Sequence, residues 1–156
     1  MKKTVILIIS HLAFAAFGFA IGIFTLPILT APDAPSQNEM TTATAQAKYT
    51  GEFTRDLQDS DFLHWGEGTI SIGQEFIAFK GSLAPGPDYN LYLSTKFIET
   101  ESEFMQLKST MSKVGPVKSF GDFIIPVPSS INPSDYNSVI VWCETFGEFI
   151  TAAKYK

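Results

Sequence analysis

The fold of this chain depends on one stretch, Tyr136-Asn-Ser-Val-Ile-Val-Trp-Cys-Glu-Thr-Phe-Gly-Glu-Phe149. Within it, Val139–Cys143 is an uninterrupted apolar run rich in β-branched and aromatic residues, which is typical of a strand buried on both faces. Strand side chains alternate, so the run divides between two faces: Val139, Val141 and Cys143 on one, and Ile140 and Trp142 on the other. We therefore expect a central strand that ends at the only cysteine of the protein.

The composition of the chain excludes some classes of function. Its formal net charge is -5 at pH 7, which argues against binding to nucleic acid and against tight docking on an anionic membrane. A single cysteine cannot form a disulfide within the chain. A free thiol in an exported domain needs a reason: burial, pairing with another molecule, or use in chemistry.

Residues 1–30 predict a membrane anchor. Residues 5–29 contain no charged side chain, and as a helix they would be about 37 Å long, enough to cross a hydrocarbon core of about 30 Å. Lys2 and Lys3 precede them and no basic residue follows until Lys48, which predicts a single-pass protein with a cytoplasmic N-terminus and an extracytoplasmic C-terminal domain. A cleaved signal peptide, which would give a secreted protein, is the alternative, although its apolar region is usually only about 7–15 residues long.

Residues 31–47 are expected to be a flexible linker, because they show no apolar periodicity. Residues 48–156 should form the folded domain. Short strands separated by turn signals favour an all-β fold, an antiparallel β-sandwich or a barrel-like domain. Besides the central strand we expect strands near 49–54, 69–72, 76–80, 89–94, 123–127 (an edge strand) and 148–155, a Gly-first hairpin loop at Gly73-Gln74, one helix over 99–111, and a helical turn at 132–136.

No established catalytic pattern is present. The sequence has no nucleophile elbow, no glycine loop for phosphate and no paired-cysteine zinc site. His64 is the one histidine of the domain, so a nucleophilic enzyme would have to pair it with Cys143. That arrangement requires the two side chains to lie within about 3 Å of each other, or to be joined by one water.

The order of the elements nevertheless resembles a known family. The matching segments are His64-Trp-Gly-Glu-Gly-Thr-Ile-Ser-Ile72, Phe76-Ile-Ala-Phe79, Gly86-Pro-Asp-Tyr-Asn-Leu-Tyr-Leu-Ser94, the Tyr136–Phe146 stretch with its Trp-Cys pair, and Phe149-Ile-Thr-Ala-Ala153. Together they resemble the DM-thirteen domain, which occurs beside DOMON domains in animal proteins and alone in many bacterial membrane-anchored proteins. The resemblance covers about residues 49–155. It implies a cell-envelope protein that takes part in electron transfer, through the single cysteine of the family or through a haem bound there.

Carried over to this chain, the resemblance implies that Cys143 is a redox thiol or a haem ligand. His64 would be a second axial ligand or a proton partner for the thiol, and a redox partner protein is implied as well. The alternative for Cys143 is a buried apolar side chain, whose pKa burial would raise. The alternative for His64 is a polar residue that caps a loop beside Trp65.

Three further residues are candidates for a ligand site or for a turn. Gly86 is expected to supply a positive φ. Asp88 is expected to accept hydrogen bonds within its own turn or to line a ligand site. Trp142, together with Tyr92, is expected either to pack in the protein or to form a platform on which a sugar ring stacks.

Two functions therefore compete. The first is an electron-transfer or redox module on the outer face of a membrane, using Cys143 with or without haem. The second is a non-catalytic β-sandwich that binds a protein or a glycan of the cell envelope, in keeping with the lack of catalytic groups and an aromatic content of 13%. An enzyme that uses Cys143 with His64 is a third hypothesis.

Overall fold

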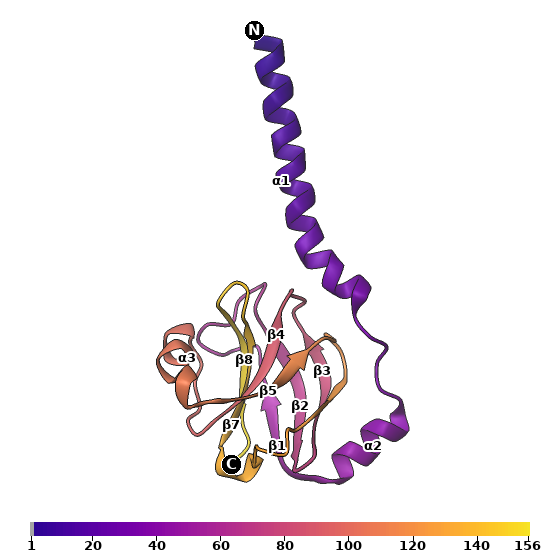
Figure 1. The fold of residues 1–156 in the computed structure, drawn as a ribbon, viewed down its shortest axis with the longest axis vertical. Coiled ribbons are helices and arrows are strands. Elements are labelled where there is room, and N and C mark those ends of the chain that lie inside the picture. The colour runs from indigo at the N-terminus through magenta and orange to yellow at the C-terminus, as the bar shows by residue number, and fades with distance from the viewer. Residues whose placement is uncertain (1) are drawn as a thin grey trace.

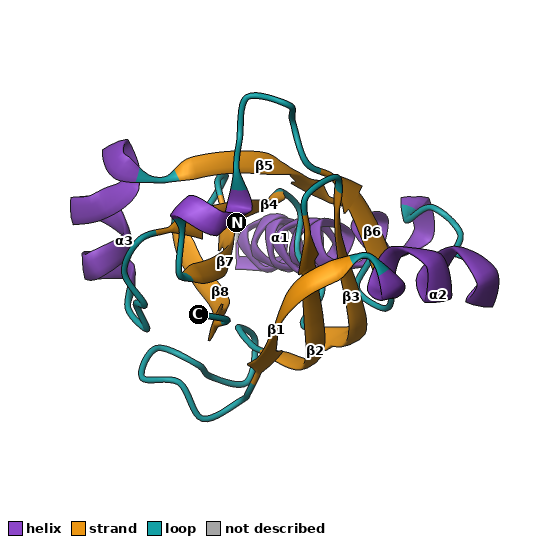
Figure 2. Cartoon of the chain, turned by 90° about the horizontal axis from the view of Figure 1, so that it is seen from below, coloured by secondary structure: helices purple, strands orange, loops and turns teal. Residues whose placement is uncertain are grey.

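The structure, a computed structural model, describes residues 2–156. A long helix, α1 (Lys2–Thr30), is followed by a short helix, α2 (Gln37–Ala45), and then by two four-stranded antiparallel sheets. Figure 1 shows α1 extending away from the domain, and Figure 2 shows the two sheets as facing layers. The expected fold class, an antiparallel β-sandwich after one N-terminal helix, is confirmed.

The eight strands divide equally between the sheets. One sheet has the order β1-β2-β3-β6 and the other has the order β5-β4-β7-β8. The strands of the first sheet are β1 (Ala47–Phe53), β2 (Gly66–Gly73), β3 (Phe76–Leu83) and β6 (Phe123–Pro126). Those of the second are β5 (Ser112–Val117), β4 (Tyr89–Ser94), β7 (Ser138–Cys143) and β8 (Glu148–Lys154). Helix α3 (Glu101–Leu107) and the 3₁₀ turns η1 (Lys108–Thr110) and η2 (Pro133–Asp135) connect strands.

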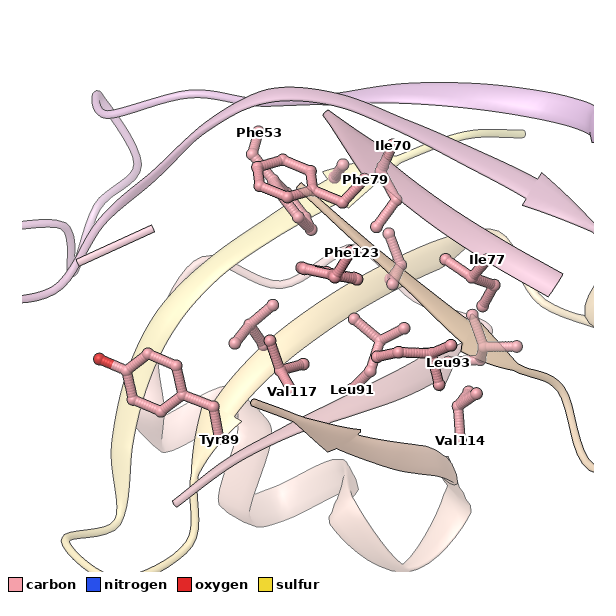
Figure 3. Packing of buried hydrophobic residues seen from close by; sticks show 14 of the residues in the cluster. Phe53, Ile70, Ile77, Phe79, Tyr89, Leu91, Leu93, Val114, Val117 and Phe123 are labelled. Carbon is pink, nitrogen blue, oxygen red and sulfur yellow. The ribbon is translucent and has the colours of Figure 1, made fainter. Parts of the chain in front are cut away.

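Strand β7 lies inside its sheet, between β4 and β8, and every one of its residues is buried. The two faces read from the sequence are confirmed: Val139, Val141 and Cys143 join the core between the sheets, whereas Ile140 and Trp142 face the opposite side. Figure 3 shows the core between the sheets, in which Phe79 packs between Phe53 and Phe123, with ring centroids 5.3 and 5.0 Å away. Burial of this apolar surface is the main stabilising contribution to the fold.

A second, smaller core lies on the outer face of the second sheet, beneath α3. The ring of Phe104 stacks on Trp142 with centroids 3.9 Å apart and planes 9° apart. Trp142 is only 1% exposed and Tyr92 5%. The hypothesis of a sugar-stacking platform is therefore wrong, because α3 covers both rings, and the packing interpretation of Trp142 is the one that the structure supports.

The stretch expected to be a flexible linker contains helix α2, so the prediction of a coil there is wrong. Ser36 and Glu39 form a capping box: the Ser36 side chain accepts the N–H of Glu39, and the Glu39 carboxylate accepts the N–H of Ser36 at 2.8 Å. Met40 and Ala43 then pack against Ala78 on the outer face of β3. A helix this short is marginal alone, and these contacts explain why it forms.

Two other local predictions differ from the structure. The β2–β3 hairpin turns at Gln74-Glu75, one residue later than expected, because Ile72 pairs with Ile77 and Gly73 is the last residue of β2. Strand β5 was not predicted, since Gly115-Pro116 has the composition of a turn. The strand lies at the edge of its sheet, where a proline without an N–H is tolerated.

Four connections meet at one end of the sandwich, which we call the loop end: residues 54–65, 84–88, 118–122 and 144–147. Helix α1 rises from the side of this end, and seen from below it projects behind the two sheets (Figures 1 and 2). Within residues 2–156, α1 is the one helix long and apolar enough to cross a membrane, although a signal sequence would meet the same criterion. None of its residues is buried in the protein.

Candidate functional site

Cys143 is the last residue of β7 and lies at the loop end. Its backbone pairs with Tyr89 on β4 and with Glu148 on β8. The tight turn that follows is closed by a hydrogen bond from the N–H of Gly147 to the Cys143 carbonyl, at 3.0 Å, with Gly147 at a φ of +72°. Cys143 is free and only 2% exposed, so its sulfur lies just beneath the surface of the loop end.

Above Cys143 is an apolar pocket of about 380 Å³ that brings together three of the candidate residues, Cys143, His64 and Gly86. Phe146 and Leu63 add to its walls, and the side chains of Phe19, Ala20, Ile23 and Phe24 contribute from α1. Asp88 lies next to the pocket, in the loop that holds Gly86. Trp142 is not part of it, because its side chain points to the opposite face of the sheet.

Hydrogen bonds join the loops around the pocket. The N–H of Glu144 donates to the Asp88 carbonyl at 3.0 Å, and the Thr145 hydroxyl donates to the Asp88 carboxylate at 3.0 Å. On the other side, the N–H of Ala84 donates to the Trp65 carbonyl at 2.9 Å. Asp88 thus links the β3–β4 loop to the β7–β8 turn, and its role as a ligand residue stays a prediction.

His64 is held by Asp61 within the 54–65 loop. The Asp61 carboxylate accepts the backbone N–H groups of Leu63 and His64, at 2.7 and 2.8 Å, and lies 3.1 Å from Nδ1 of His64. Partial burial acts to raise the pKa of Asp61, but these N–H groups and the imidazole lower it below its ordinary value. No hydrogen bond joins His64 to Cys143, although both residues are among those described.

Gly86 does not have the positive φ expected from the sequence; among residues 2–156 the glycines with positive φ are Gly68 and Gly147. A glycine is needed at this position because a side chain would collide with Tyr89. A Cβ at this position would lie 2.4 Å from the hydroxyl oxygen of Tyr89, whose ring packs against the glycine. Tyr89 in turn is buried beside Cys143, and its pKa is raised by burial and by the nearby thiol group.

Two opposing effects act on the Cys143 thiol. Burial raises its pKa, and this effect prevails. The backbone N–H groups of Phe146, Asp88 and Thr145 act in the opposite direction, because they favour a negative charge on the sulfur. The thiol is therefore protonated at neutral pH, in surroundings that already hold hydrogen-bond donors for a thiolate.

Comparison with known proteins identifies the family of the domain. The profile of a family described as "Electron transfer DM13" matches residues 56–155, from the first loop of the loop end to the residue after β8. The chain belongs to the DM13 family. No curated protein and no solved structure shows significant similarity to it. The matched region contains every candidate residue of this DM13 domain, from His64 to Cys143, and excludes α1 and α2.

Sequence reasoning missed the exposed apolar residues at the loop end of the DM13 domain. Phe62, Leu63 and Phe146 are all exposed at the loop end. A signal was present, because Phe62-Leu63 is an apolar pair between two polar residues in a turn-rich segment. The role of Asp61 was also missed, although an Asp in a loop commonly accepts the backbone N–H two residues on, as Asp61 does from Leu63.

The DM13 domain holds a partly buried ion pair between the β7–β8 turn and η1. Glu144 accepts hydrogen bonds from Lys108, at 2.6 Å, and from the Tyr92 hydroxyl. Burial acts to raise the pKa of Glu144, but the bonds from Lys108 and Tyr92 lower it below its ordinary value of 4.5. A lowered pKa means that this contribution to stability is present above the unfolded pKa and is lost as the pH falls through the folded pKa.

We expect Glu144→Gln to lower the free energy of unfolding by about 1 kcal/mol at pH 7, a modest value because Lys108 is partly exposed, and by much less near pH 3. Urea unfolding at the two pH values measures the difference. The matched control is Glu75→Gln, an exposed carboxylate on the β2–β3 turn. An equal loss at both pH values would show that the charge of Glu144 contributes nothing.

Proposed function

We propose that this chain is a membrane-anchored redox module in which Cys143 is the group that changes oxidation state. The observation that carries the proposal is the position of Cys143: the single cysteine of this chain, which belongs to an electron-transfer family, lines an apolar pocket that His64 also lines. Helix α1 supports the anchor, and Lys2 and Lys3 before it support an N-terminus in the cytoplasm with the domain outside.

The surroundings of the thiol favour selective rather than rapid chemistry. The thiolate is the reactive form of cysteine, and the raised pKa keeps it scarce at neutral pH. At 2% exposure the sulfur meets only molecules that enter the pocket. The three backbone N–H groups would stabilise the thiolate formed when a proton leaves, and His64 is the one imidazole at the pocket that can accept a proton.

A haem fits the residues of this pocket poorly. A cysteine ligates iron as a thiolate, and here burial keeps the sulfur protonated and covered. His64 alone resembles a ligand, because its Nδ1 is oriented by Asp61 and its other nitrogen is left available. The proposed module therefore uses the thiol itself, with a redox partner that reaches the loop end.

A Cys143–His64 hydrolase has no support from the geometry. Such an enzyme needs a hydrogen bond between the nucleophile and its base. His64 bonds instead to Asp61, and it is absent from the groups that shift the pKa of Cys143.

The test follows the oxidation state of Cys143 in the purified full chain. Mild hydrogen peroxide is expected to oxidise the thiolate to a sulfenic acid, with the peroxide reduced to water, and dithiothreitol is expected to restore the thiol. Intact-mass measurement detects the added oxygen, and Cys143→Ala is the control that must not gain it. Absorbance before and after dithionite tests for haem, and no Soret band is expected.

Two outcomes would contradict the redox proposal. One is a thiol that peroxide does not oxidise while the chain is folded. The other is a Cys143→Ala protein that is folded and fully active in the cell, which would favour the non-catalytic binding module instead.

A further inference from the structure

Three exposed apolar side chains at the loop end are here called the rim of the Cys143 pocket: Leu63 and Phe146 line the pocket, and Phe62 is the neighbour of Leu63 in the same loop. Phe62 is 91% exposed, Leu63 45% and Phe146 53%. The hydrogen bonds that Leu63 and His64 donate to Asp61 hold the first of these loops in a defined turn, and the bond from Gly147 to Cys143 does the same for Phe146. Apolar groups held outward in ordered loops indicate a contact surface.

Helix α1 takes part in the same surface. Phe19, Ile23 and Phe24 line the Cys143 pocket together with Leu63 and Phe146. A neighbouring pocket of about 430 Å³ is lined by Leu26 and Pro27 of α1 and by the 84–88 and 118–122 loops. The rim is therefore continuous with the apolar surface of α1, none of whose residues is buried in the protein.

The length of α1 sets the level of the membrane. A hydrocarbon core of about 30 Å takes about 20 residues of helix, whereas α1 has 29. If the core begins near Val5, after Lys2 and Lys3, it ends near Phe24. Phe24 is one of the residues that line the pocket, so the membrane boundary falls at the height of the loop end.

We propose that the loop end sits on the bilayer that α1 crosses, with Phe62, Leu63 and Phe146 in the interfacial region, so that the Cys143 pocket opens toward lipid. This inference rests on the anchor in the proposed function. Aromatic side chains are favoured at this depth, and an apolar surface binds there by burying about 5–10 Å into the headgroup boundary. The rim itself contacts lipid rather than a protein, so the redox partner of Cys143 would reach the pocket from the membrane.

The charges of the loop end restrict the kind of lipid. Its four loops carry six carboxylates and two basic side chains, so their balance is acidic. The carboxylates are Asp56, Asp59, Asp61, Asp88, Asp122 and Glu144, and the basic side chains are Arg55 and Lys118. Acidic groups next to the rim disfavour an anionic surface, so attachment depends on apolar burial and is not strengthened by anionic headgroups. Neutral lipids such as phosphatidylcholine are the fitting partner.

The experiment places a tryptophan at the rim of the full chain in vesicles of phosphatidylcholine whose acyl chains carry bromine near the headgroup. The variants are Phe62→Trp and Phe146→Trp, and the control is Gln74→Trp, an exposed residue at the opposite end of the sandwich. All are made in a Trp65→Phe background, so that the buried Trp142 is the one other tryptophan and contributes the same background fluorescence to every variant. We expect about twofold more quenching at positions 62 and 146 than at position 74, unchanged by added phosphatidylserine.

Each contrary outcome has its own meaning. Equal quenching at the three positions, in a chain that floats with the vesicles in a density gradient, would show that the loop end stands clear of the lipid and would leave the anchor intact. A chain that does not float with the vesicles would contradict both the anchor and the docking.

The wild-type chain provides a check that needs no variant. A photoactivatable phosphatidylcholine should label residues 61–64 and 145–147, and labelling elsewhere alone would overturn the docking. Peroxide oxidation of Cys143 is measured separately, so failure of the docking and failure of the redox function are distinguishable.

Discussion

Trp142→Ala is expected to lower the free energy of unfolding by about 3–5 kcal/mol. The indole is 1% exposed, stacks on Phe104 and forms the floor of the smaller core under α3. Its removal leaves a cavity between the sheet and the helix, and it also loses the ring beside which Lys108 lies, with Nζ 5.9 Å from the ring centroid. Helix α3 is short and should then be the first element to unfold.

Urea unfolding followed by far-ultraviolet circular dichroism measures this loss. The control is Phe146→Ala. Phe146 lies in the connection between β7 and β8, its aromatic side chain is 53% exposed, and its removal should change stability by less than about 1 kcal/mol. Trp142→Phe sharpens the test: the indole N–H is buried with no partner, so phenylalanine keeps the stack, removes an unpaired donor, and should cost less than about 1.5 kcal/mol. Similar losses for Trp142→Ala and Phe146→Ala would contradict the account of the smaller core.

Gly68→Ala is expected to destabilise the domain by about 3 kcal/mol or more. Gly68 has a φ of +139°, in the middle of the β2–β3 pairing. A Cβ there would lie 2.3 Å from the carbonyl oxygen of Lys80 and 2.7 Å from the Cα of Gly81, and both atoms belong to backbone that cannot move without breaking the sheet.

The matched control for this substitution is Gly121→Ala. Gly121 lies in the 118–122 loop, its φ is not positive, and a Cβ there would meet nothing within 4 Å. Alanine should leave stability unchanged within about 0.5 kcal/mol or raise it slightly, because it restricts the unfolded chain. Thermal unfolding of the two variants side by side gives the comparison, and a Gly68→Ala protein as stable as Gly121→Ala would show that the backbone at residue 68 relaxes freely.

The sequence predicted best those elements that can be recognised from their own residues alone. Strand β7 is buried on both faces, so an apolar β-branched run identifies it without knowledge of its neighbours. Strand β5 contains Gly115-Pro116 and forms because β4 supplies its partner, which no local pattern records. Helix α2 depends on Met40 and Ala43 meeting Ala78 far along the chain, although the Ser36–Glu39 capping box was visible in advance.

The candidate site shows the same division. Three of the five residues singled out from the sequence, Cys143, His64 and Gly86, line one pocket, whereas Asp88 and Trp142 do not. What the residues do there could not be predicted: the pKa of Cys143 depends on burial and on N–H groups from two different loops. The apolar rim was missed because single exposed aromatic residues become a surface only when the fold brings Phe62 and Phe146 to the same end.

The route of the chain from α1 to β1 has a mechanical consequence. Helix α1 lies beside the loop end, but Ala47, the first residue of β1, pairs with Gly73 at the far end of the sandwich. Strand β1 is also the outermost strand of its sheet. A force that pulls α1 away from the domain would first detach α2 and then load the β1–β2 hydrogen bonds one after another from Ala47. The domain should therefore extend at low force, with α2 and β1 released before the inner strands separate.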